Sequence, residues 1–101
     1  MNVVSAQPET LEITGLKELS GAAATSVRDQ IRSALTPVHL NLEIDLSETV
    51  FMDSSGLGTL ISLHKTLRAR GGQFRLINPS STCQQLLELT RLHRTFEIVA
   101  R

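Results

Sequence analysis

The stretch TVFMDSSGLGTL, residues 49–60, decides the fold because a strand ends and a helix begins within it. Two apolar positions run into Asp53, and the two serines Ser54 and Ser55 follow before the glycine Gly56. Free backbone N–H groups and the helix dipole favour negative charge at such a junction. The stretch therefore predicts an exposed helix start that suits phosphate chemistry.

Downstream of this stretch, apolar residues recur at helical spacing and predict a helix over 55–69, which ends at RARGG. QFRLIN, residues 73–78, predicts a short strand. A third helix is expected to start at a serine cap and to carry Cys83 and Leu87 on one face. TFEIVA, residues 95–100, predicts the last strand.

Upstream of the stretch, HLNLEIDL alternates apolar and polar residues, with Leu40, Leu42, Ile44 and Leu46 expected on one face of a strand. Helical spacing predicts a helix from about residue 20 to residue 35, which Pro37 prevents from continuing. TLEITGL, residues 10–16, predicts a half-buried strand. Val3 and Val4 indicate a short edge strand before it.

Strands that alternate with helices in this way require crossover connections, which predict a mostly parallel sheet. We expect an α/β fold with four or five strands and three main helices largely on one face. At 101 residues the chain has room for one hydrophobic core, so residues 1–101 are expected to form a single domain.

Composition narrows the class of function. Ten basic residues balance ten acidic residues, which predicts no attraction to nucleic acid or an anionic membrane and favours a protein partner. The one cysteine, Cys83, indicates a reducing compartment. The lone thiol also has no second thiol beside it to form a metal site. With no secretory leader at the start and no long apolar run, we expect a cytoplasmic protein.

Three interpretations of the central stretch compete. A phosphate-binding loop needs a lysine that this chain lacks before Lys65, and a dinucleotide fingerprint needs a glycine where Ile61 stands. A nucleophile elbow needs a glycine two residues before its serine, and the three histidines are scattered, so we do not expect an enzyme. A structural role makes Ser54 or Ser55 the helix cap and uses the glycines for close packing.

The run FMDSSGLGTLISLHKTLRARGGQFRLINPSSTCQQLLELTRLHRTFEIV resembles the STAS domain, and in particular the bacterial anti-sigma-factor antagonists. The resemblance covers residues 38–100 well and the first third loosely. Two positions depart from the family pattern. The acid that follows Gly15 falls at Glu18, and Arg91 stands where the family often has glycine.

The resemblance implies a phosphorylation switch. In this switch the unphosphorylated chain binds an anti-sigma factor that is also a serine kinase of the histidine-kinase-like ATPase fold. This binding releases the kinase's client, which is the sigma factor or another protein. Phosphorylation of Ser54 ends this binding, and a metal-dependent serine phosphatase restores it. ATP and the metal belong to these partners, so the resemblance implies that the chain has no cofactor of its own. The alternative is a non-switching STAS subunit of a lipid transporter or of a larger signalling assembly. The expected partner-binding residues are Asp53, Ser54, Ser55, Gly56, Leu57 and Glu18, although Leu57 could equally pack into the core.

Overall fold

The computed structural model describes residues 1–101, with Ala6 described by its backbone alone. Five strands form one sheet in the order β1-β2-β4-β6-β7, and all neighbours are parallel except β1 and β2. The strands are β1 (Asn2–Gln7), β2 (Thr10–Thr14), β4 (Asn41–Asp45), β6 (Gln73–Ile77) and β7 (Glu97–Val99). The expected mostly parallel sheet is confirmed.

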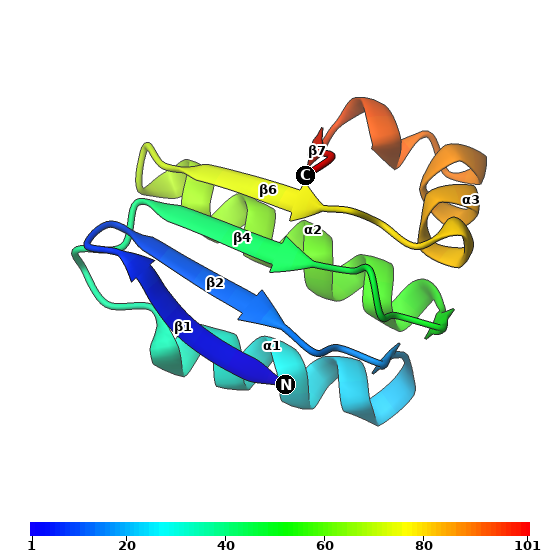
Figure 1. Cartoon of the computed structure of the whole chain (residues 1–101), viewed down its shortest axis with the longest axis horizontal. Helices are drawn as coiled ribbons and strands as arrows, with labels where there is room; N and C mark the ends of the chain where they lie inside the picture. Colours follow the sequence, from blue (N-terminus) through cyan, green and yellow to red (C-terminus); the bar gives the residue numbers. More distant parts are fainter.

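Helices cover one face of this sheet. Figure 1 shows α1 and α2 side by side behind the strands, with α3 beyond the carboxyl end of β6. The helical elements are α1 (Gly21–Ala34), α2 (Ser54–Ala69), α3 (Ser81–Leu89) and the short 3₁₀ helix η1 (Leu92–Arg94). No helix of the described chain has the length and apolar character needed to cross a membrane.

The core lies between the sheet and the two long helices. The period of two in β4 places Leu42 and Ile44 in this core, where both are almost completely buried. Leu40 shares their parity but precedes β4 and remains 37% exposed. On α2, Leu60 is fully buried, whereas Ile61 is only partly buried and packs against the edge of the core.

Two further strands of two residues each prepare the start of both long helices. β3 (Glu18–Leu19) leads into α1, and β5 (Phe51–Met52) leads into α2. They pair in parallel, with Glu18 opposite Phe51 in the register. This pairing brings the first turns of α1 and α2 to the same end of the molecule (Figure 1).

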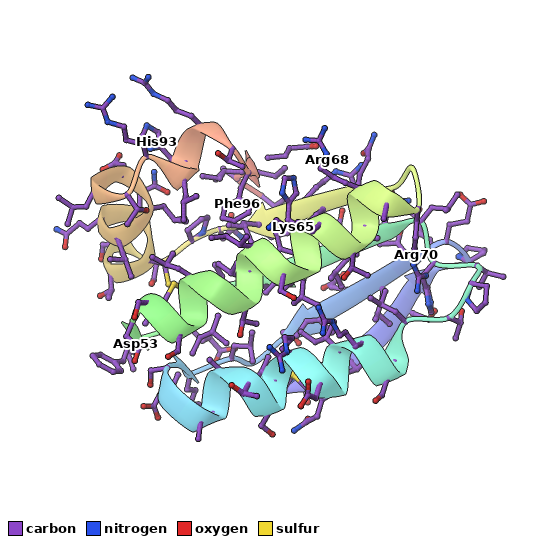
Figure 2. The ribbon with its side chains drawn as sticks, turned by 180° about the vertical axis from the view of Figure 1, so that it is seen from behind. Asp53, Lys65, Arg68, Arg70, His93 and Phe96 are labelled. Atoms are coloured by element: carbon purple, nitrogen blue, oxygen red, sulfur yellow. The ribbon has the colours of Figure 1, made fainter. Side chains whose placement is uncertain are left out.

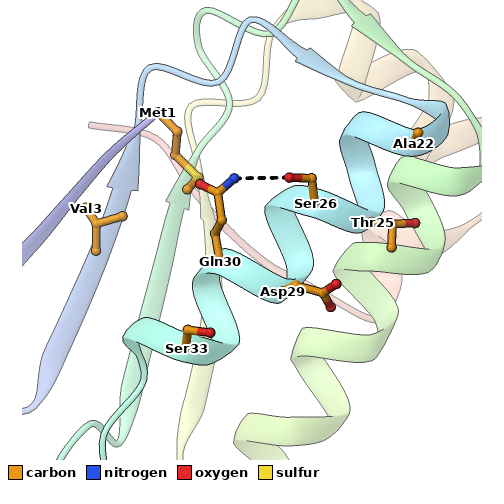
Figure 3. A pocket seen from close by; sticks show the side chains of 8 residues that line it. All are labelled: Met1, Val3, Ala22, Thr25, Ser26, Asp29, Gln30 and Ser33. Atoms are coloured by element: carbon orange, nitrogen blue, oxygen red, sulfur yellow. Dashed lines mark hydrogen bonds between the residues drawn. The ribbon is translucent and has the colours of Figure 1, made fainter.

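A groove of about 690 Å³ runs between β1 and the outer side of α1. Figure 3 shows Val3 on one wall and small polar side chains of α1 on the other, where Gln30 donates a hydrogen bond to Ser26 at 3.1 Å. The groove is lined by one carboxylate, that of Asp29, and by no histidine or cysteine. Its lining offers no acid–base pair for catalysis.

Candidate functional site

Asp53 is the cap of α2. Its backbone is extended, and its Oδ1 accepts hydrogen bonds from the N–H groups of Ser55 at 2.9 Å and Gly56 at 3.2 Å. The prediction that Ser54 or Ser55 caps the helix is wrong. Both serines already lie inside the first turn, where a side chain no longer occupies the capping position.

The same carboxylate also binds the start of α1. The N–H of Gly21, the first residue of α1, donates to Asp53 Oδ2 at 3.2 Å. Ser20 precedes α1 but does not cap it, because its hydroxyl donates to Glu18 Oε1 at 2.7 Å. The positive ends of two helices therefore meet at one carboxylate, which helix dipoles favour.

Ser54 and Ser55 are exposed at this junction. Neither hydroxyl forms a hydrogen bond with another described residue. Ser54 is the first residue of α2 and directly follows the capping aspartate. A reacting group from another molecule can therefore reach the Ser54 hydroxyl without first breaking a hydrogen bond within the chain.

The remaining predicted partner-binding residues fall into two groups. Glu18 is exposed on β3 beside the junction. Gly56 and Leu57 are buried, and Leu57 retains only 7% exposure within the core. A Cβ atom on Gly56 would lie 2.1 Å from the carbonyl oxygen of Leu19, so this glycine lets α2 approach β3 closely. Both residues support the site from beneath.

Val50 and Phe51 are an exposed apolar pair next to this junction that the sequence interpretation did not single out. Their exposed fractions are 74% and 53%. Phe51 belongs to β5, and two-residue strands carry too few residues for a period to show which side is buried. Large exposed apolar side chains beside a functional group are typical of a protein contact.

The histidines lie elsewhere. His39 is buried, and its Nδ1 accepts the N–H of Thr36 at 3.0 Å. His64 packs its ring against Phe74 and Phe96, as expected of a packing histidine. Burial, and secondarily the Arg68 guanidinium, lower the pKa of His64. None of the described histidine rings hydrogen-bonds to Ser54 or Ser55.

Comparison with known proteins identifies the family. The family model described as STAS domain matches residues 3–101. The anti-sigma-B factor antagonist of Listeria monocytogenes is 32% identical over 81 residues, which cover 80% of this chain and 71% of that protein. The anti-sigma F factor antagonist of Lysinibacillus sphaericus is 35% identical over 89 residues, covering 83% and 73% respectively.

A solved structure agrees with this result. The anti-sigma factor antagonist SpoIIAA in its unphosphorylated form superposes with a TM-score of 0.85 at 25% sequence identity, over 99% of this chain and 86% of that one. Sequence and three-dimensional structure thus give the same answer over nearly the whole chain. The chain belongs to the STAS domain family.

Proposed function

We propose that this protein is an anti-sigma factor antagonist that works by partner switching. Its unphosphorylated form binds an anti-sigma factor, and phosphorylation of Ser54 ends the complex. The observation that carries the proposal is the exposed, unbonded hydroxyl of Ser54, directly after the aspartate that caps α2. The relatives named as anti-sigma factor antagonists supply the class of partner.

The surroundings of Ser54 suit a contact that charge can break. Val50 and Phe51 offer exposed apolar area a few residues before Ser54, which a partner that docks at the start of α2 would cover. A phosphate brings roughly −1.5 to −2 charges into that contact. The start of α2 can partly accommodate the phosphate, but the Asp53 carboxylate repels it.

The energy needed for release is modest. A loss of about 1.4 kcal/mol in binding free energy lowers affinity tenfold. Repulsion and desolvation of a buried phosphate reach a few kcal/mol, so no rearrangement of the fold is required. In this scheme the anti-sigma factor is also the ATP-dependent serine kinase, and a metal-dependent phosphatase restores Ser54. The chain is then a substrate and a ligand in the cytoplasm and catalyses no step.

Phosphopeptide mapping tests the proposal. Immobilised chain is used to retain its partner from the native cell, and the retained kinase is incubated with free chain and ATP. We expect one phosphate on Ser54. We expect the phosphorylated chain to bind the kinase much more weakly than the unphosphorylated chain does. Ser54→Ala should bind but stay unmodified, and Ser55→Ala, the matched control, should be phosphorylated like the wild type.

Two results would contradict the proposal. The first is a phosphate on Ser55 in the wild-type chain, and the second is full affinity for the kinase after phosphorylation. Retention of transporter subunits without a kinase would instead favour a non-switching STAS subunit.

A further inference from the structure

The charges of this neutral chain are segregated along the sequence. The first 59 residues hold eight of the ten acidic side chains, and residues 60–101 hold seven of the ten basic side chains. The equal numbers of basic and acidic residues predict no net electrostatic field around the whole molecule, but they do not exclude a charged surface on one part of it. Separation of this kind produces local potentials even at zero net charge.

Three of the seven C-terminal bases have internal partners. Arg75 and Arg101 bind Glu43, and Arg75 also binds Glu97 at 3.0 Å. Arg70 donates to the carbonyl oxygens of Thr36 and His39. The other four are exposed and form no ion pair with a carboxylate of the described chain, and we call them the basic face: Lys65, Arg68, Arg91 and Arg94.

Packing holds the segment that follows Arg94 against α2, the helix that carries Lys65 and Arg68. The His64 ring on α2 meets the Phe96 ring edge-on at 5.3 Å between centroids. Arg68 and Thr95, the residue after Arg94, line the same groove of about 390 Å³, together with Glu97, whose carboxylate is paired with Arg75. Figure 2 shows the outer side of α2 with Arg68, and across Phe96 the segment that carries His93.

Stabilisation of helix α2 explains the presence of only some of the cations of the basic face. Cations in the last turn of α2 offset its dipole, which explains Arg68. Arg91 and Arg94 lie outside α2, at η1, and the dipole of α2 gives no reason for them. The one carboxylate in the groove beside Arg68, that of Glu97, is already paired with Arg75, so the four exposed cations keep their charge free for a negatively charged partner.

The basic face is continuous with the surface around Ser54. Ser54, Gly58, Ile61, Lys65 and Arg68 are spaced by four, three, four and three residues, which places them along one side of α2. Gly58 is exposed and Ile61 partly so. Eleven residues separate Ser54 from Lys65, which corresponds to about 16 Å along the helix axis.

We propose that the basic face extends the docking surface that begins at Ser54 and receives an acidic segment of the same protein partner. This inference rests on the proposed function. A protein segment fits better than nucleic acid, because the rings of Phe74 and Phe96 beside the groove are buried and cannot stack on bases. The distance of about 16 Å exceeds the screening length of about 10 Å at 0.1 M salt, so a phosphate on Ser54 changes the potential at the basic face little and acts on the contact at the start of α2.

Association kinetics with the kinase retained by the Ser54→Ala chain test this inference. We expect the double variant Arg68→Gln/Arg94→Gln to lower the association rate constant about fivefold at about 50 mM salt, with the difference shrinking at about 500 mM. The single variants Arg68→Gln and Arg94→Gln should each lower the rate constant by part of this effect, and Arg28→Gln, which removes one charge from α1, is their control. It should leave the rate constant within about 1.5-fold of wild type, because steering depends on where a charge lies.

The outcomes separate the two proposals. An unchanged association rate and salt dependence in the double variant, with phosphorylation of Ser54 intact, overturns the basic face and leaves the switch standing. Absence of both kinase binding and Ser54 phosphorylation overturns the switch, and with it the acidic partner segment. Binding of a short DNA duplex that the double variant loses, without any change in kinase association, assigns the basic face to nucleic acid instead. Thermal melts of each variant confirm that the fold is retained.

Discussion

Asp53 accepts N–H groups at the start of two helices, namely α2, which directly follows it, and α1, which begins 32 residues earlier in the sequence. The N–H of Gly21 lies 3.2 Å from Asp53 Oδ2, while Oδ1 serves Ser55 and Gly56 at the start of α2. One carboxylate thus satisfies N–H groups in two helices. The junction that presents Ser54 is therefore also a point on which the packing of α1 against α2 depends.

Replacement of this carboxylate should cost more than the loss of an ordinary cap. We expect Asp53→Ala to lower the free energy of unfolding by about 2 kcal/mol, the upper end for a cap, because three N–H groups lose their acceptor. Urea denaturation measures this loss. Asp53→Asn retains one oxygen acceptor and should lose less than half as much. Ser55→Ala should stay within about 0.5 kcal/mol of wild type, since its hydroxyl caps nothing. A stability of Asp53→Ala equal to that of Ser55→Ala would contradict the shared cap.

Two glycines of α2 should respond in opposite directions to the same substitution. In Gly56→Ala the new Cβ would meet the Leu19 carbonyl oxygen at 2.1 Å, and the backbone shift should cost about 1–3 kcal/mol. Gly58 faces open space, so Gly58→Ala should stabilise the fold by about 0.5–1 kcal/mol through reduced chain entropy. Denaturant midpoints that move in the same direction for both variants would refute the close approach of α2 to β3.

Arg91 adopts a backbone conformation that favours glycine. Its φ is +62°, at the residue where the family often has glycine. Left-handed conformation costs a residue with a side chain about 1–2 kcal/mol, partly offset by the greater chain entropy of glycine when unfolded. Arg91→Gly should therefore raise the free energy of unfolding by about 0.5–1 kcal/mol. Arg94→Gly removes the same charge from η1 without relieving such strain, and it should lower stability instead.

His64 should make stability depend on pH. Its pKa is lowered in the folded chain, first by burial and then by Arg68, so the unfolded chain binds more protons as pH falls below about 6.5. The contribution of His64 is therefore full above that pH and declines as pH falls towards the lower folded pKa. Unfolding midpoints between about pH 7 and pH 5 should fall more steeply for wild type than for His64→Gln. Equal slopes in the two proteins would contradict this assignment.

The sequence predicted those features that a repeating pattern encodes. Alternation in residues 39–46 and helical spacing after Asp53 were enough to place β4 and α2, because burial of one face imposes a period. The serine cap of α3 was also predicted correctly, since Ser80 accepts the N–H of Cys83 at 3.3 Å. These features are local in the chain.

Contacts between distant segments were not predictable in this way. No pattern near Asp53 indicates that Gly21 lies beside it, because their proximity depends on the parallel pairing of β3 with β5. The burial of Leu57 likewise depends on how closely Gly56 lets α2 approach β3. The position of an apolar residue in the helical pattern cannot show whether its side chain contacts a partner protein or packs into the core.

The uncovered face of the sheet has a consequence for aggregation. A sheet open on one side could stack against a second sheet, as in a sandwich. Here the register aligns a row of charged residues across four strands of that face, namely Glu12, Glu43, Arg75 and Glu97. Stacking would have to remove water from the exposed members of this row, and taking charged groups out of water is costly. The face that no helix covers therefore resists stacking against a second sheet.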